Sequence, residues 1–353
     1  MMIKMKKIIS LYLVLVLCVF QLMFFSACGN GNNEQSGEET PETNFVCFGS
    51  YPQKDVTKEK GEEFAEYAEN LPANGNDNGW TSYKYYLSGS NDADYMWYKD
   101  IDLDNDGKND YRGVYFTEYR PDWTDESKSS AYQNQNGYYK KSVYWFEFEP
   151  IKWKILENKD GKAFLLAALI IDSQDYNHVY NRETKDGKML YGNNYAYSSV
   201  RAWLNNDFYN AAFTETEKIL IDVVEVDNSL LSTIPNRGSG AYDGKYTCDN
   251  TNDRVFLLSV EEVTKNEYGF SSSLTLGDKK RQKHASDYAK IQGTAAIDSD
   301  YGYWWLRSPS VFDTKGEGDS AFFISPNGGD DYRYARVHCT PCGIAPAMWI
   351  SLI

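Results

Sequence analysis

The sequence predicts an α+β fold in which short helices surround small antiparallel sheets. Short runs with the alternating pattern of β-strands recur along the chain, and the helical patterns between them are brief. This combination is typical of α+β proteins rather than of parallel sheets. Of the 353 residues 42% are hydrophobic, so the chain contains ample material for a buried core.

The N-terminus has the pattern of a lipoprotein signal peptide. A basic start is followed by the apolar run 8–25 and then by Ser26, Ala27 and Cys28. This order resembles a bacterial lipobox and predicts a signal peptide at 1–27, with a lipid on Cys28 after cleavage. The alternative is an uncleaved membrane anchor, because the apolar run is just long enough to span a bilayer. In both cases we expect the rest of the chain at the extracellular face of the cytoplasmic membrane.

The next two parts of the chain differ in composition. Residues 28–43 have no large apolar side chain to bury, and we expect a flexible tether. Residues 44–142 are expected to form an N-terminal strand and an aromatic, acidic elaboration. The expected elements are a strand at Phe45–Pro52, an amphipathic helix at Lys58–Leu71, strands within Trp80–Tyr98 and a strand at Arg112–Thr117.

The pattern becomes more regular in residues 143–353. Strand patterns at Ser142–Trp153 and Ala163–Ile171 flank a turn at Asn158–Gly161, which predicts a hairpin. A helix is expected at Ser198–Leu204, with Ser198 or Ser199 as its N-cap and Val200, Trp203 and Leu204 on one face. The later expected elements are a helix from a Thr214/Glu217 capping box through Ile221, a strand at Asp253–Ser259, short helices at Val260–Glu267 and Ala285–Ile291, a turn at Pro326–Gly329 and a strand at Gly343–Leu352.

The C-terminal stretch contains the candidate binding surface. Residues 331–338 have a two-residue period, which would place aromatic and basic side chains on one face of a strand. Tyrosine and arginine give large contact area at interfaces, so this face is predicted to bind a ligand. The predicted ligand-binding residues are Tyr332, Tyr334, Arg336 and His338, with Phe312, Asp313, Asn327, Asp330 and Asp331 as the rim.

Several blocks of the chain together resemble a bacterial lipoprotein domain family of unknown function, common in gut Firmicutes. The resemblance covers residues 45–53 and 143–353. The blocks that carry it are Phe48–Gln53, Pro150–Leu156, Val200–Asn205, Phe213 with Glu217, Val255–Ser259, Tyr288 with Ala289, Trp304–Pro309 and Gly343–Ile350. One departure is Ala345, which stands where the family has an arginine before Pro346.

The resemblance implies a C-type-lectin-like fold at 143–353, similar to sulfatase-modifying proteins and to variable proteins diversified by retroelements. In the diversified proteins, solvent-facing residues near the C-terminus change ligand specificity. The resemblance therefore implies that residues 312–342 form a display face. It also implies a scaffold role for Trp304, Trp305, Leu306, Pro346 and Trp349.

The charge of the chain limits its partners. The formal net charge is −15, and removal of the basic leader would make the remaining chain more acidic. Such a chain is repelled by nucleic acid and by anionic lipid headgroups. We therefore expect an external protein or carbohydrate ligand, no nucleic acid, and membrane attachment only through the lipid anchor.

The cysteines do not form a disulfide framework. Apart from Cys28 and one leader cysteine, only Cys47, Cys248, Cys339 and Cys342 remain, too few for a chain of this length. Cys339 and Cys342 have redox-motif spacing, but the segment after them has a strand pattern and lacks the helix start that would lower a thiol pKa. The alternatives left are a structural disulfide and two loop thiols.

An acidic loop is the one metal candidate, and no cofactor is otherwise required. Asp102, Asp104, Asp106 and Asp110 surround Gly107 with spacing that resembles a calcium loop. The last ligand position of an EF-hand is Gly113 instead of glutamate, which excludes a complete EF-hand. The alternative is a polar turn, in which aspartates bond to nearby backbone groups.

The predicted function is ligand binding at the cell surface, not catalysis. The three histidines, His178, His284 and His338, lack a nucleophile context, and His178 and His284 are expected to be ordinary surface residues. Rival hypotheses are a formylglycine-generating-type or cell-wall-acting enzyme and a structural or adhesive module. Tryptophans that could stack on sugars, or else pack in the core, are Trp80, Trp97, Trp123 and Trp145.

Overall fold

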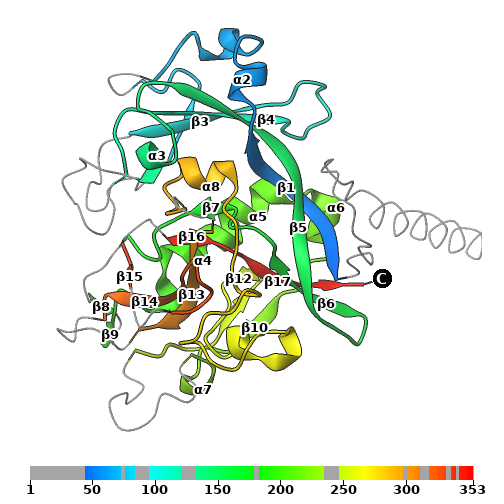
Figure 1. Cartoon of the computed structure of the whole chain (residues 1–353), viewed down its shortest axis with the longest axis vertical. Coiled ribbons are helices and arrows are strands. Elements are labelled where there is room, and N and C mark those ends of the chain that lie inside the picture. The colour runs from blue at the N-terminus through cyan, green and yellow to red at the C-terminus, as the bar shows by residue number, and fades with distance from the viewer. Residues whose placement is uncertain are drawn as a thin grey trace, which may run out of the picture.

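The protein is a mixed α+β structure, rich in antiparallel strands and with short helices, as a computed structural model shows (Figure 1). The predicted fold class is therefore confirmed at this level. The residues described are 44–72, 76–83, 95–120, 132–178, 183–185, 187–233, 246–296, 301–310, 318–330, 335–338 and 342–352.

The largest sheet is built around the long strand β5 (Val143–Lys159). The first part of β5 pairs with β4, the middle with β1 and the last part with β6, all antiparallel. The order is β12-β17-β6-β5-β4-β3-β2, and β1 pairs with β5 beside this path. The partner strands are β1 (Phe45–Asp55), β2 (Thr81–Ser82), β3 (Met96–Ile101), β4 (Tyr111–Phe116), β6 (Lys162–Ala167), β12 (Val255–Phe256) and β17 (Ala347–Ser351).

The predicted hairpin is confirmed. β5 and β6 pair as far as Lys159 and Lys162, and the turn between them contains Asp160 and Gly161. Both turn residues have positive φ, 52° and 73°, as a two-residue hairpin turn that follows the twist of its strands requires. The strands predicted near Phe45, Trp80 and Arg112 also exist, and they extend the same sheet instead of forming a separate one.

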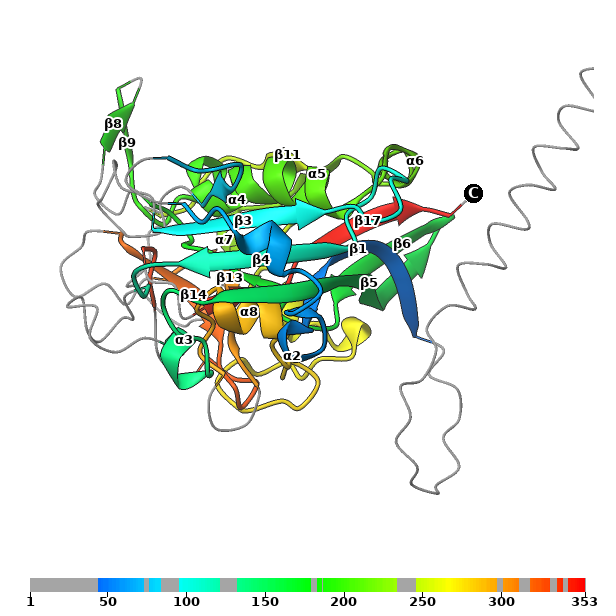
Figure 2. The same cartoon turned by 90° about the horizontal axis from the view of Figure 1, so that it is seen from above.

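A second sheet has five strands. In the view of Figure 1 it lies below α8 (Asp287–Ile291), which itself lies below β3 and β4 of the large sheet. Its order is β15 (Ala335–Arg336), β14 (Ser320–Ile324), β13 (Tyr303–Pro309), β16 (Cys342–Ile344) and β7 (Asp172–Ser173). Trp304 and Trp305 on β13 are fully buried in the main core, as the scaffold role expects. Figure 2 shows β3, β4 and β5 side by side across the face seen from above.

The strand expected at Gly343–Leu352 is two strands in different sheets. β16 ends at Ile344, and β17 begins at Ala347 after Ala345 and Pro346. Proline has no backbone N–H to donate to a ladder, so a strand is readily broken there. The C-terminal segment consequently links the five-stranded sheet to the large one.

The helices are short, and their caps agree with the sequence. α4 (Ser199–Trp203) begins after Ser198, whose side chain accepts a hydrogen bond from the Arg201 N–H. α6 (Glu215–Lys218) has the predicted capping box of Thr214 and Glu217 but ends before Ile221. The remaining helices and small strands are α2 (Thr57–Lys60), α3 (Tyr132–Gln135), α5 (Tyr209–Ala212), α7 (Leu230–Thr233), β8 (Glu183–Lys185) with β9 (Lys188–Leu190), and β10 (Val224–Val226) with β11 (Thr251–Asp253).

Three predicted elements need correction. The helix expected at Lys58–Leu71 is the single turn α2 followed by a 3₁₀ turn at Ala65–Ala68, and the helix expected at Val260–Glu267 is broken into two 3₁₀ turns. The strand expected at Asp253–Ser259 is interrupted at Arg254, between β11 and β12. Runs this short gain little from helical hydrogen bonding, so packing of their side chains decides the local shape.

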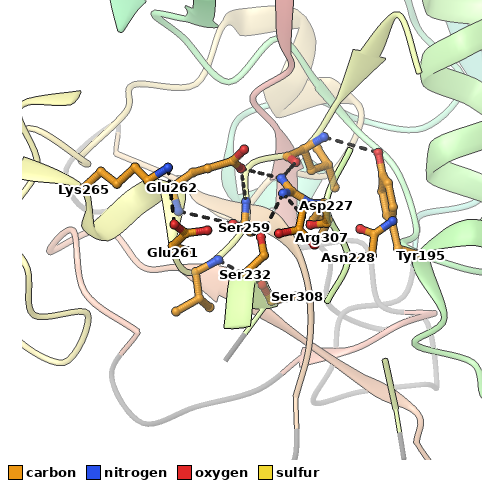
Figure 3. A network of polar contacts seen from close by, with 12 residues as sticks. Tyr195, Asp227, Asn228, Ser232, Ser259, Glu261, Glu262, Lys265, Arg307 and Ser308 are labelled. Carbon is orange, nitrogen blue, oxygen red and sulfur yellow. Dashed lines mark hydrogen bonds and ion pairs between the residues drawn. The ribbon is translucent and has the colours of Figure 1, made fainter. Parts of the chain in front are cut away.

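Arg307 on β13 connects three loops inside the core. Its guanidinium donates to the carbonyl oxygens of Leu257 (2.8 Å) and Asp227 (3.0 Å), and to the carboxylate of Glu262. Glu262 also accepts the Ser259 N–H at 2.7 Å. Figure 3 shows these contacts converging on the buried side chain. Arginine suits this position because its planar fork supplies five donors in one fixed geometry.

We expect Arg307→Met to destabilise the protein by about 3–5 kcal/mol, because the half-buried Glu262 carboxylate would lose its ion-pair partner and buried carbonyl oxygens would lose their donor. Urea unfolding followed by circular dichroism measures this change. Arg336→Met is the control, since Arg336 is an exposed arginine whose ion pair with Asp319 is 3.9 Å long. Equal unfolding midpoints for the two variants would show that the Arg307 contacts do not stabilise the fold.

Lys283 is a second buried cation, but no carboxylate pairs with it among the residues described. Its Nζ donates to the carbonyl oxygen of Ala167 and lies 5.5 Å from the ring centre of Trp304. Burial, with a smaller contribution from the charge of Lys154, lowers the pKa of Lys283 to about 7. In the unfolded chain the same amine keeps its proton up to a pH near 10.

The unfolded state therefore binds more protons at this site between pH 7 and pH 10, so stability contributed by Lys283 rises with pH over that range. We expect Lys283→Met to raise the free energy of unfolding at pH 7 by about 1–4 kcal/mol, as replacement of buried ionic groups by apolar ones often does. The gain should shrink towards pH 10. Urea titrations at several pH values measure this, with exposed Lys58→Met as the control; a gain that is the same at every pH would contradict it.

Candidate functional site

A cavity of about 480 Å³ lies where the N-terminal strands meet the segments that follow β7 and begin α4. This volume is in the range of ligand-binding pockets in proteins. The residues on its wall are Tyr51, Thr81, Ser82, Tyr83, Tyr98, Arg112, Arg120, Asp172, Gln174, Asp175, His178, Ser199, Val200, Ala202, Trp203, Asn206, Asp207 and Ala211. The two halves of the chain therefore build one site together.

Arg112 on β4 is buried in the cavity wall. Its Nε and Nη2 donate to the two carboxylate oxygens of Asp100, each at 2.7 Å, and its Nη1 donates to the Tyr288 hydroxyl at 3.1 Å. The guanidinium also covers the ring of Tyr98, 4.2 Å from its centre. Burial alone would lower the pKa of Arg112, but the Asp100 carboxylate raises it well above its usual value. Arg112 therefore stays charged, and the Asp100 carboxylate already balances its charge.

Asp172 on β7 is the matching buried acid. Its Oδ2 accepts the Tyr51 hydroxyl at 2.6 Å, and its Oδ1 accepts the Ser173 N–H at 2.6 Å and the Gln174 amide at 3.1 Å. Burial raises the pKa of Asp172, whereas these hydrogen bonds and the nearby charge of Arg120 lower it in part. Arg120 is held in place by the carbonyl oxygens of Ser173 and Gln292, at 2.8 and 2.7 Å.

Asp175 and His178 form the next part of the wall. Oδ2 of the buried Asp175 lies 3.4 Å from Nδ1 of His178, while Oδ1 has no hydrogen-bond partner among the described residues. The His178 N–H donates to Ser199 Oγ at 2.8 Å, and that hydroxyl donates to Asn177 at 3.2 Å. The expectation that His178 is an ordinary surface residue is therefore wrong, because the start of α4 holds it in the cavity wall.

The side towards α4 is aromatic and polar. Trp203 is half-buried, stacks on Phe208 with ring centres 5.5 Å apart, and lines the cavity. A π-helical turn at Leu204–Phe208 follows, and Asn206 and Asp207 reach the cavity from it. Partial burial raises the pKa of the Asp207 carboxyl. Turns of this kind are frequent at functional sites because they redirect side chains.

The residues that the sequence singled out at the C-terminus lie elsewhere. Tyr332, Tyr334, Phe312, Asp313 and Asp331 are outside the described residues, as is Cys28. Arg336 is exposed on β15 and His338 is half-buried, whereas Ala335 and Val337 are buried, so the expected alternation is seen in this short part.

Two rim residues belong to a turn. Asn327 accepts the Gly329 N–H at 2.6 Å and the Ser325 hydroxyl at 2.8 Å. The prediction that Asp330 lies on the rim of an exposed binding face is wrong, because its side chain is fully buried.

The C-terminal segment nevertheless reaches the cavity wall from behind. The Asn177 N–H donates to the Val337 carbonyl oxygen at 2.8 Å, one residue before His178. β15 and β7 are the two edges of the five-stranded sheet, and β7 supplies Asp172 to the cavity. The described part of the display segment at 335–338 is thus bonded to the loop that carries His178.

The acidic loop at 102–110 has features of a calcium loop and of a polar turn. Single carboxylate oxygens of Asp102, Asp104 and Asp106 lie within 4.8 Å of one another, whereas Asp110 is outside this group. These carboxylates accept backbone N–H groups of the loop, as a polar turn would. Melting temperatures measured with calcium and with a chelator distinguish the calcium loop from the polar turn. Only a calcium loop is stabilised by the ion.

The remaining motifs have structural positions. Trp80, Trp97 and Trp145 are buried, which confirms packing for these three, and Trp123 lies outside the described residues. Cys342 is a buried, reduced thiol on β16, so Cys339 and Cys342 are not bridged. Cys47 is disulfide-bonded.

Sequence reasoning missed the cavity because its wall comes from segments far apart in the chain. Trp203 was assigned only to the packing face of its helix, and Asp175 and His178 only to a polar loop. The one local signal is the Asp-x-x-His spacing at 175–178, which is too common to identify a site.

Comparison with known proteins gives one match. A family model described as a domain of unknown function (DUF6273) matches residues 160–352, which include β6, β7, α4 and the C-terminal strands. This agrees with the expected resemblance to a domain family of unknown function. No curated protein and no solved structure matches the chain. Among the residues described, no helix is long and apolar enough to cross a membrane.

Proposed function

The chain belongs to the DUF6273 family, and from its own cavity we propose that it is a ligand-binding lipoprotein of the cell surface. The lipid on Cys28 would hold it at the extracellular face of the cytoplasmic membrane, with residues 28–43 as the tether. Its ligand would be an exposed part of an external glycan or protein. The domain at 143–353 would be a C-type-lectin-like fold, for which antiparallel sheets with short helices give support.

The observation that carries this proposal is the composition of the cavity wall. Tyr51, Tyr83, Tyr98 and Trp203 supply aromatic surface, and buried polar groups stand between them. Pockets that bind small ligands combine these two features, since apolar rings supply contact area and a few oriented polar groups give specificity. A volume of about 480 Å³ suits one or two sugar rings or a short peptide end.

Binding is proposed rather than catalysis because Asp172 and Ser199, two of the reactive groups on the wall, are already held in hydrogen bonds. Asp172 accepts three hydrogen bonds, and the Ser199 hydroxyl donates to Asn177 instead of to a base. A formylglycine-type oxidase would need a pair of accessible cysteines, whereas Cys342 is buried behind β7. The C-terminal face with Arg336 is a second surface that the same ligand could contact if it extends beyond the cavity.

We expect Trp203→Ala to weaken ligand binding at least tenfold, because an aromatic anchor in a pocket contributes a large share of the binding energy. The measurement is binding of the purified full chain, in detergent, to an array of glycans and short peptides, with calorimetry for each hit. Tyr197→Ala is the control, since Tyr197 is an exposed aromatic residue outside the cavity.

Asn206→Ala provides a second cavity variant that leaves the Trp203 stacking intact. Hits that both cavity variants bind as tightly as the unchanged protein would place the binding site elsewhere. A full panel without any hit would count against binding of glycans and peptides altogether.

A further inference from the structure

The charges on the cavity wall do not balance. Each of its two arginines has an acid: Arg112 forms a two-point pair with Asp100, and Arg120 is the nearby cation of Asp172. Two further carboxylates line the same cavity, Asp175 and Asp207. Neither forms an ion pair with lysine or arginine in the part of the chain that the structure describes. The wall therefore carries an excess of negative charge.

Of the two carboxylates, Asp175 has the greater need of a compensating charge, because it is buried and only 3% exposed. Among the residues that the structure describes, its only ionic contact is Nδ1 of His178 at 3.4 Å, and an imidazole supplies a full positive charge only when it is protonated. Its other oxygen is buried and has no hydrogen-bond partner among the described residues. A buried carboxylate that lacks a donor on one oxygen costs folding free energy, and a positive charge in the cavity that Asp175 lines would offset part of this cost.

Asp207 adds negative charge at the rim of the cavity. It follows Trp203 on the π-helical turn, and its raised pKa has partial burial as the main cause. A cation entering the cavity would relieve this cost as well, because an opposite charge nearby stabilises the ionised carboxylate.

The aromatic rings favour an organic cation over a bare ion. Tyr98 already has a guanidinium on its face, but Tyr83 and Trp203 also line the cavity. Ring faces attract ammonium groups once these have lost their water, most strongly in the case of tryptophan. Hydroxyl and amide groups of Ser199, Asn206 and Gln174 on the same wall suit a ligand that also carries hydroxyl groups.

We propose that the ligand of this cavity carries a primary ammonium group on a small hydroxylated frame, bound by Asp175 with Asp207 and Trp203 beside it. This inference rests on the proposed function, since it names the chemistry of the ligand for the same cavity. An amino sugar with a free amine is a representative of the class. A neutral sugar would leave the charge excess of the wall uncompensated.

The test compares pairs of compounds that differ in a single ammonium group. The pairs are D-glucosamine with D-glucose, ethanolamine with ethylene glycol, and 1,4-diaminobutane with 1,4-butanediol, each titrated into the full chain at pH 7 by calorimetry. N-acetyl-D-glucosamine tests whether the amine must be free, and calcium chloride tests for a bare cation. We expect D-glucosamine to bind at least tenfold more tightly than D-glucose, and the amine of each other pair to bind more tightly than its neutral partner.

Variants then connect the preference to the wall. Asp175→Asn keeps the size of the side chain and should reduce the amine preference at least tenfold, whereas Glu215→Gln, at an exposed acid of α6, should leave it unchanged. Asp207→Asn, at the rim, should reduce it less. Because Asp175 is buried, melting without ligand checks that the Asn variant folds; if it does not, the Asp207 variant decides.

The outcomes separate this inference from the proposed function. Neutral compounds that bind as tightly as their amine partners, an acetylated sugar as good as the free amine, or an equal response to calcium would overturn the ammonium assignment and leave ligand binding intact. If no compound binds in the cavity, and the glycan and peptide array also gives no cavity-dependent hit, both proposals fail.

Discussion

The pairing of β5 with three other strands is the constraint on which the structure depends. One run of backbone hydrogen bonds joins β4, β1 and β6 in turn, so residues before 143 cannot move independently of those after it. The family match begins at 160, within this same sheet. The N-terminal strands therefore share a sheet with strands of the matched region, and they supply one wall of the cavity. Without them, Asp172 and Trp203 would lie on an open surface.

Most buried charged side chains in the described part of the protein are stabilised by hydrogen bonds or by an oppositely charged partner. Arg307 satisfies three loops, Arg112 forms a two-point pair, and Asp172 accepts three donors. Such arrangements are costly to desolvate and hold together only when each member is bonded. Two exceptions among the described residues are therefore informative: Lys283 donates to a carbonyl oxygen but has no carboxylate partner, and Asp175 has one oxygen without a hydrogen bond. Lys283 lies outside the cavity, whereas Asp175 lines it.

Local features were predictable from the sequence, and long-range ones were not. The hairpin at Asp160–Gly161, the Ser198 cap and the Thr214/Glu217 capping box depend on neighbouring residues, which a sequence displays directly. The cavity wall depends on contacts between residues far apart in the chain, such as the hydrogen bond between Tyr51 and Asp172, 121 positions apart. The split of Gly343–Leu352 between two sheets likewise depends on pairing with distant strands, β7 in one sheet and β6 in the other. Alternation at 335–338 was visible, but burial of Asp330 was not, because a turn residue faces inward only through tertiary packing.

The C-terminal segment at 335–338 and the cavity wall are joined by a backbone hydrogen bond. The Val337 carbonyl accepts the Asn177 N–H, and the next residue is His178, the partner of Asp175. A shift of the 335–338 backbone would therefore change the position of the imidazole and, through it, the carboxylate. Substitutions on the exposed side of this segment, where Arg336 lies, leave the backbone bond in place and change only the outer surface. Exposed side chains of this segment can thus be substituted without changing the geometry of the cavity wall. The condition is that residues 335 and 337 stay small enough to remain buried.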